Sequence, residues 1–341
     1  MTDGSVPEHK LSEHDWLLIE TLGRTRTGRS EVPTVVADGS KVKDWASLLR
    51  LRRELNAAAP QRIVEVVQSC AETGEFVAHR ETGLVVVGVP IRCAFDEVHG
   101  VQVWAGRDDV RLPERPRVAA WDWQADTELA HHGPGLEELV FARAPADVRV
   151  IRTPPEAFGR MVRFEGRIDY FEMVGTLDGR HQSAVDMIGD DGLVRSFQMV
   201  TRADPVARRI RALMREFTDA APAQPDVDMT MLRAVSQRAD EGVGFIWLSS
   251  GLIYEWTRTP TPPLDRWGTE RPTVHPDDLA DFHAACAALA EERAAAAAAR
   301  HLRLRVRFTD TDWIPVRAEL LPVLPAESGH GLIRVWRELA N

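Results

Sequence analysis

The spacing of apolar positions predicts short helices and strands in three successive groups along the chain. Alternation with period two, which places every second side chain on one face of a strand, is clearest at 301–308. Apolar residues recur at helical spacing at 62–74, and Gly74 is a suitable helix end. Two segments that contain proline and lack periodicity, 107–120 and 219–229, are typical of connections between domains.

The first group combines predicted helices with two predicted strands. Segments 16–23 and 44–56 fit helices, whereas the β-branched segments 83–93 and 99–106 fit strands. This order predicts a sheet with helices packed on one of its faces.

The second group begins with a strand in which Trp121 and Trp123 share one face. A short strand and two helices that begin near prolines follow. Three strands are then predicted and are joined by Asp-Gly turns, at 166–177, 180–188 and 193–201.

The third group repeats that order: a strand pair at 242–256, a helix, and three strands at 301–308, 313–323 and 330–339. The second and third groups are therefore a divergent tandem repeat. We predict an α+β protein of three domains, each an antiparallel sheet with helices packed on one face. The predicted boundaries are 1–112, 113–204, a linker helix at 205–224, and 225–341.

The linker helix is predicted from an apolar stripe within 205–219, formed by Ile210, Leu213, Met214 and Phe217. Three roles are open for this stripe. It docks on a neighbouring sheet, forms the seam of a homodimer, or transmits a signal between domains.

Composition restricts the classes of function. The formal net charge of −10 disfavours nonspecific binding to nucleic acid, which requires a concentrated basic surface. Three widely spaced cysteines, Cys70, Cys93 and Cys286, predict neither a disulfide framework nor a zinc site, and we expect them to be small core residues. The N-terminus lacks a signal peptide and no apolar run reaches about 20 residues, so we expect a cytoplasmic protein that does not enter membranes.

The tetrad His275-Pro276-Asp277-Asp278 offers a candidate metal or acid–base site. Its adjacent carboxylates point in different directions, whereas metal sites on helices use i, i+4 spacing. Pro276 suits the first helical position, and the two aspartates lie in the first turn, where the helix dipole favours negative charge. We predict a helix start here.

The sequence VHPDDLADFHAAC, with the Trp-containing strand pair before it and LRLRVRF and DWIPVRAELLPV after it, resembles a PAS domain over about 243–338. The middle block, 118–202, is similar to a PAS domain through WDWQADTELAHHGPGLEELVF. The first block looks like a GAF-type sensor domain through PIRCAFDEVHGVQVWAG. The order resembles a family of stand-alone triple-sensor proteins from actinobacteria.

This resemblance implies a pocket between each PAS-like sheet and its helices. Seven aromatic residues are the predicted ligand-binding candidates: Trp121, Trp123, Phe158, Tyr170, Trp247, Trp256 and Phe282. No catalytic or metal-binding residue is predicted, since the chain lacks the GxxxxGK[ST], GxSxG, GxGxxG and HExxH motifs. We expect the neighbouring His131 and His132 to face opposite sides of a strand, and we expect His283 to be solvated.

We therefore predict a non-enzymatic cytoplasmic signalling protein that senses a small ligand, binds a protein partner, or does both. Its signal would pass to a separate effector protein, and no cofactor is required by the sequence. One alternative is an interaction scaffold that binds no small molecule. The other is an enzyme that uses a pocket in the GAF-like block.

Overall fold

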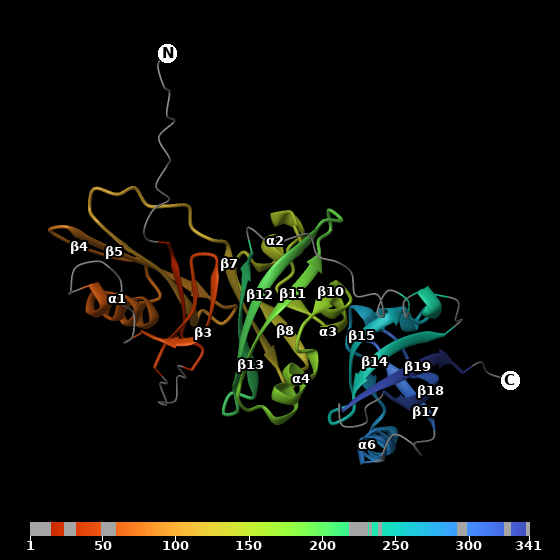
Figure 1. The fold of residues 1–341 in the computed structure, drawn as a ribbon. Coiled ribbons are helices and arrows are strands. Elements are labelled where there is room, and N and C mark those ends of the chain that lie inside the picture. The colour runs from red at the N-terminus through yellow and green to blue at the C-terminus, as the bar shows by residue number, and fades with distance from the viewer. Residues whose placement is uncertain are drawn as a thin grey trace.

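A computed structural model describes residues 15–23, 32–48, 59–217, 231, 234–237, 241–291, 299–323 and 329–338. Three antiparallel sheets follow one another along the molecule in chain order, from the red and orange first sheet to the blue third sheet (Figure 1). The predicted connection at 219–229 and the alanine-rich segment 292–298 lie outside the described residues.

The first sheet has six strands in the order β3-β2-β1-β6-β5-β4. Their bounds are β1 Leu17–Glu20, β2 Thr34–Asp38, β3 Lys41–Ser47, β4 Val77–Glu81, β5 Leu84–Arg92 and β6 Val98–Gly106. Helix α1 (Ala59–Thr73) packs on β5 and β6 through its buried stripe of Ile63, Val66, Val67 and Cys70. Strand β6 is buried along its whole length, because α1 covers one of its faces and the second sheet contacts the other.

The second sheet has seven strands in the order β10-β11-β12-β13-β7-β8-β9. Its elements are β7 Val118–Gln124, β8 Leu129–His132, α2 Leu136–Val140, η2 Pro145–Asp147, β9 Ile151–Arg152, α3 Pro154–Phe158, β10 Met161–Phe164, α4 Arg167–Thr176, β11 Arg180–Ile188, β12 Val194–Asp204 and β13 Arg209–Glu216. The helices are short, and α4, the longest of them, has 10 residues.

The third sheet has six strands in the order β15-β14-β19-β18-β17-β16. Its elements are β14 Gly242–Trp247, β15 Leu252–Arg258, η3 Leu264–Gly268, β16 Thr273–Val274, α6 Pro276–Glu291, β17 Arg300–Arg307, β18 Ile314–Pro322 and β19 His330–Arg337. The second sheet has the same order with one additional edge strand, β9. The strand orders therefore bear out the expected repeat of one architecture.

The predicted fold class was wrong. The described chain is mostly β, with few helices, rather than three sheets each covered on one face by helices. The physical reason is visible in the middle sheet. The five-residue helices α2 and α3 are too short to cover a sheet face, and neighbouring sheets supply much of the cover instead.

Four segments have a different secondary structure from the predicted one. The prediction of a linker helix at 205–219 was wrong, because Arg209–Glu216 forms strand β13 in the second sheet. The prediction of a strand at 166–177 was also wrong, because Arg167–Thr176 forms helix α4. The helix at 16–23 is also wrong, since Leu17–Glu20 is strand β1, and within 44–56 the described residues to Ser47 belong to strand β3.

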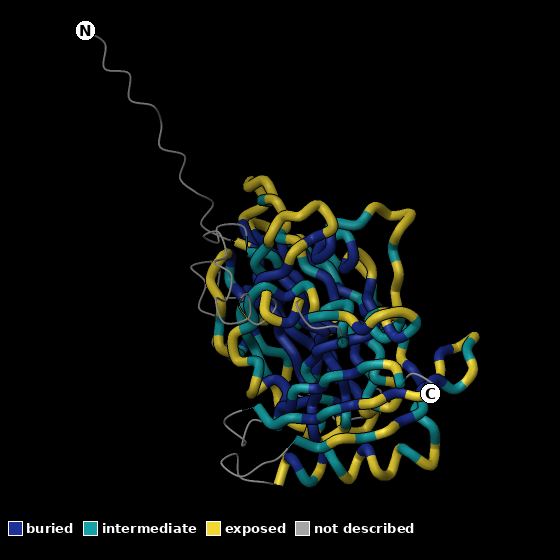
Figure 2. The backbone as a smooth tube through the Cα atoms, turned by 90° about the vertical axis from the view of Figure 1, so that its right-hand side faces the viewer, coloured by how far each residue is buried: buried dark blue, intermediate teal, exposed yellow. Residues whose placement is uncertain are grey.

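Strand β13 explains why the second sheet is buried on both faces. Ile210 and Met214 point into the core of the second sheet, whereas Leu213 packs against the first sheet. Arg211 and Arg215 share the face of Leu213 and donate hydrogen bonds to the backbone carbonyls of Leu22 and Gly39 in the first sheet. Figure 2 shows the resulting pattern, with buried segments in dark blue concentrated in the interior and exposed segments in yellow at the periphery.

The His275 segment begins a helix, as predicted. Helix α6 starts at Pro276 with Asp277 and Asp278 in its first turn. The Asp278 carboxylate also accepts hydrogen bonds from the backbone and the guanidinium of Arg305 on β17, at 2.7 to 2.9 Å. The guanidinium of Arg305 lowers the pKa of Asp278. The tetrad thus ties the helix start to the sheet.

Candidate functional site

An apolar cavity of about 60 Å³ lies in the second sheet domain, between the strands and the helices α2, α3 and α4. We call it the central cavity. Its lining is described by three groups of side chains: the aromatics Trp121, Trp123, Phe141, Phe158, Phe164, Tyr170 and Phe171; the methionines Met161, Met187, Met199 and Met214; and the smaller residues Ala130, His132, Leu136, Val140, Pro154, Ala157, Val174 and Leu252. The lining has few polar groups, chiefly the His132 imidazole and the Tyr170 hydroxyl.

Four of the seven predicted ligand-binding candidates line the central cavity: Trp121, Trp123, Phe158 and Tyr170. The two tryptophans alternate along β7 with the buried Asp122, so both tryptophans face the same side, as predicted. Tyr170 reaches the cavity from helix α4 rather than from a strand. Burial raises the pKa of Tyr170, which keeps its hydroxyl protonated at neutral pH.

The other three candidates lie elsewhere. Trp247 packs against Phe171 at the contact between the second and third sheets, with ring centroids 5.5 Å apart. Phe282 borders a hollow of about 400 Å³ and Trp256 borders another of about 540 Å³, both of which mix apolar and charged residues. The seven residues therefore do not form one site.

The sequence did not reveal a buried ion cluster at the edge of the cavity. Glu137 is 1% exposed, and its carboxylate accepts a hydrogen bond of 2.6 Å from Nδ1 of His132 and binds the guanidinium groups of Arg152 and Arg143. His131, on the opposite side of β8, instead packs against Phe95 of the first domain. The neighbouring histidines thus face different sides, as expected, and only His132 reaches the cavity.

The third sheet contributes directly to the cavity and its wall. Leu252 of β15 lines the cavity, and Phe171 contacts Tyr254 of the same strand. The Tyr254 hydroxyl lies 3.0 Å from Nδ1 of His330 on β19. Arg167, at the start of α4, forms an ion pair of 3.0 Å with the buried Glu255. The helix that walls the cavity is therefore fastened to the third sheet.

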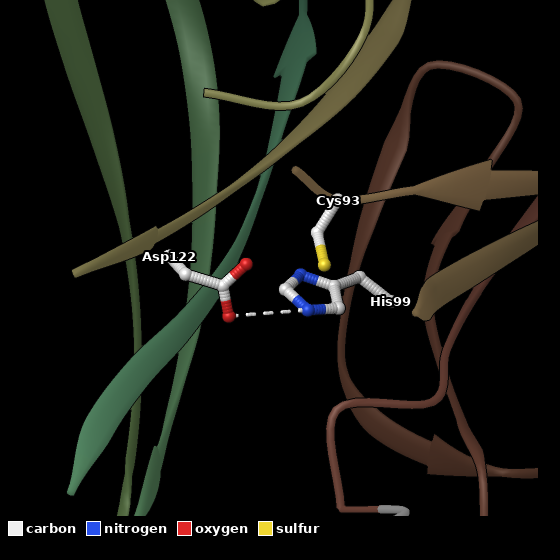
Figure 3. A group of neighbouring side chains, drawn as sticks. All are labelled: Cys93, His99 and Asp122. Atoms are coloured by element: carbon white, nitrogen blue, oxygen red, sulfur yellow. Dashed lines mark ion pairs between the residues drawn. The ribbon is translucent and has the colours of Figure 1, made fainter. Parts of the chain in front are cut away.

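A second group of chemically active side chains lies where the first and second sheets meet. Cys93, His99 and Asp122 approach one another from β6, β7 and the turn after β5, so that one ligand atom of each lies within 4.8 Å of the others (Figure 3). All three are buried. His99 Nε2 is 3.3 Å from Oδ1 of Asp122, and Arg209 Nη1 is 3.6 Å from the same oxygen.

The local chemistry of this group is unusual for a protein interior. Burial and the charge of Asp122 raise the pKa of the Cys93 thiol to about 12. Burial opposes ionisation of Asp122, but His99 in its protonated form and the guanidinium of Arg209 outweigh burial and hold the pKa of this carboxyl below its usual value. Sequence reasoning treated Cys93 as a plain core residue, whereas the structure places it beside a carboxylate and an imidazole. The sequence feature that could have revealed it is Trp121-Asp122-Trp123, in which a carboxylate lies on a strand between two tryptophans of the core and so faces the opposite side.

Residues 15–114 match the family model described as "Rv3651-like, N-terminal". A crystal structure of an uncharacterised protein from Mycobacterium tuberculosis is similar to the whole chain, with a TM-score of 0.74 and 21% sequence identity over 96% of this chain and 97% of that chain. This likeness shows that the two proteins share a fold. No curated protein matches the chain.

Neither comparison establishes the expected GAF- and PAS-type sensor domains, which stay a prediction. The family match covers the first sheet, and the structural match covers all three sheets. Among the described residues, no helix combines the length and the apolar character needed to cross a membrane.

Proposed function

We propose that this protein is a non-enzymatic sensor in which the central cavity binds a small apolar molecule and the third sheet responds to it. One observation carries the proposal: Leu252 of the third sheet lines a cavity whose other lining residues belong to the second domain. A molecule in the cavity would therefore touch two domains at once, and its binding energy would depend on how they are packed.

The lining defines the chemistry of the ligand. A cavity needs roughly 10–15 Å³ to hold one water molecule, but water also needs two to four polar partners. At about 60 Å³ with an almost entirely apolar wall, the central cavity favours an apolar guest. Four methionines line it, and their flexible side chains adapt to guests of different shape. We infer a small apolar or aromatic compound with at most one or two polar groups, which would face His132 or Tyr170.

Phe171 supplies the route from the cavity to the third sheet. Its ring lines the cavity, and it also contacts the rings of Trp247, Tyr254 and His330. A guest that displaces Phe171 changes the packing of those three residues. The size of the response is limited by the difference in the guest's affinity for the two packing arrangements.

The proposal includes two expectations from the sequence. A separate effector protein receives the signal, and the chain is related to the family of triple-sensor proteins. Two titratable groups line the cavity, and neither is poised for acid–base catalysis, because burial keeps the Tyr170 hydroxyl protonated and His132 is hydrogen-bonded to Glu137. The lining therefore supports binding of a ligand rather than its turnover. The signal would leave the chain through the third sheet.

Binding is tested by NMR of the full chain labelled with ¹³C at the methionine methyl groups, titrated with benzene, indole and 1-hexanol. The four cavity methionines should shift, whereas Met173, which is buried outside the lining, and the exposed Met231 should not. Val174→Phe, which fills the cavity, should abolish the shifts, and Val194→Phe on the exposed surface should preserve them. If no compound shifts the cavity methionines of the wild-type chain, the scaffold alternative replaces the sensor.

A further inference from the structure

We propose that Cys93, His99 and Asp122 bind one divalent transition-metal ion, with Zn²⁺ as the best match, and that the ion fastens the first sheet to the second. The three side chains come from both sheets, and thiolate, imidazole and carboxylate are the ligands that Zn²⁺ takes in proteins. This inference is independent of the apolar cavity, which lies on the other face of β7.

The hydrogen bonds of His99 fix its tautomer. Nδ1 lies 3.2 Å from the carbonyl oxygen of Ala212, which only accepts hydrogen bonds, so Nδ1 carries the proton. Nε2 lies 3.4 Å from Nε of Arg211, which only donates, so Nε2 presents its lone pair. This is the arrangement of a metal-binding histidine, whose second ring nitrogen donates to a backbone carbonyl.

Nε2 also lies close to a carboxylate, and an ion bound here would take the place of the hydrogen bond from Arg211. Oδ1 of Asp122 is 3.3 Å away, and neither oxygen of this carboxylate has a hydrogen-bond partner among the described residues. Two electron-rich atoms at this distance in a buried site repel each other, and a cation bound between them removes that repulsion. For Zn–N and Zn–O bonds of about 2.0–2.1 Å, a tetrahedral ion places its nitrogen and oxygen ligands about 3.3 Å apart. The observed separation fits the ion.

The charges around the site also fit. The guanidinium groups of Arg209 and Arg211 are surrounded by the carboxylates of Glu97, Asp122 and Asp204. With a neutral imidazole and a neutral thiol, this buried group carries one excess negative charge. A divalent ion that displaces the proton of the Cys93 thiol brings the group to neutrality, and a small rotation of the thiol places the sulfur about 2.3 Å from the ion. The fourth coordination position would be left to a water molecule.

The site is tested with the full chain, stripped with a chelator in mild denaturant and refolded with Co²⁺ or Zn²⁺. We expect one ion per chain by elemental analysis, and a sulfur-to-cobalt charge-transfer absorption in the near ultraviolet. Binding should release about one proton per ion, because the Cys93 thiol must ionise. Cys93→Ser should remove the absorption, and Asp122→Asn should weaken binding by more than about 10-fold.

The matched control is the double variant Cys70→Ser with Cys286→Ser, which leaves Cys93 as the sole cysteine. It should keep the absorption and the stoichiometry, and this result identifies the sulfur ligand even if Cys93→Ser does not fold. The proposal is overturned if the refolded wild-type chain holds no ion. It is also overturned if the absorption survives in Cys93→Ser or disappears in the double variant. If the refolded wild-type chain holds no ion, a proton shared by His99 and Asp122 occupies the place of the ion.

Discussion

Phe171 and Tyr254 belong to different domains, yet the centroids of their rings lie 4.3 Å apart. Phe171 is 1% exposed and lines the central cavity, whereas Tyr254 lies on the strand of the third sheet that also carries Leu252. The wall of the cavity is therefore part of the contact between two sheets. Occupancy of the cavity and packing of the third sheet are mechanically connected in this fold.

Truncation of Phe171 should weaken that contact. Phe171→Ala removes a buried ring and should lower the free energy of unfolding by about 3–5 kcal/mol, measured by urea denaturation of the transition that includes the second sheet. Ile168→Ala is the matched control, because Ile168 lies on the same helix but is 50% exposed, and it should change stability by less than about 0.5 kcal/mol. Equal effects of the two substitutions would show that Phe171 carries no special packing role.

The contact between the first and second sheets should depend on buried arginines. Arg215 donates hydrogen bonds to the carbonyl of Gly39 and, at 3.1 Å, to Oε1 of Gln198. Arg215→Met keeps most of the side-chain volume but leaves buried acceptors without their donor, which should cost about 1–3 kcal/mol in thermal or urea unfolding. The exposed Arg80→Met should be neutral, and a neutral Arg215→Met would contradict this assignment.

These two contacts also show where sequence reasoning reached its limit. Period-two alternation correctly predicted most strands, because a strand half-buried in its own sheet alternates apolar and polar side chains. Strand β13 is buried on both faces and carries arginines that bind a neighbouring domain. Its apolar residues at positions 210, 213 and 214, with Phe217 directly after the strand, therefore have the spacing of an amphipathic helix. A sheet face covered by another domain is invisible to local periodicity.

The candidate sites were predictable to different degrees. The alternation of Trp121 and Trp123 was sufficient to place both on one face, and both line the central cavity. The Cys93–His99–Asp122 group was not predictable, since its members come from two sheets and have no local metal-binding spacing. Helix α6 was predicted from its start signals, and His283 on this helix is exposed as expected.

Stability should fall in mildly acidic solution because of His330. Burial, followed by the charge of Arg167, lowers the pKa of His330 from 6.5 to about 4. The unfolded chain therefore binds the proton more readily, so the contribution of this residue is complete above about pH 6.5 and is lost as the pH falls toward 4. The loss amounts to roughly 3 kcal/mol.

The measurement is the free energy of unfolding at several pH values between 7 and 4, for the wild-type chain and for His330→Gln. The variant should show a shallower decline over this interval, because glutamine does not titrate. His301→Gln, at an exposed position, should decline as the wild-type chain does. Parallel curves for His330→Gln and the wild-type chain would rule out His330 as the group responsible.

A guest in the cavity should change the packing of the third sheet. This change is measured by ¹⁹F NMR of the chain labelled with 5-fluorotryptophan. Trp247 does not line the cavity but packs on Phe171, whereas Trp313 packs against His275 at the start of helix α6. When a compound that shifts the cavity methionines is added, the Trp247 resonance should move in proportion to occupancy and the Trp313 resonance should stay fixed. Saturation of the cavity with no change in the Trp247 resonance would show that the third sheet does not respond to the guest.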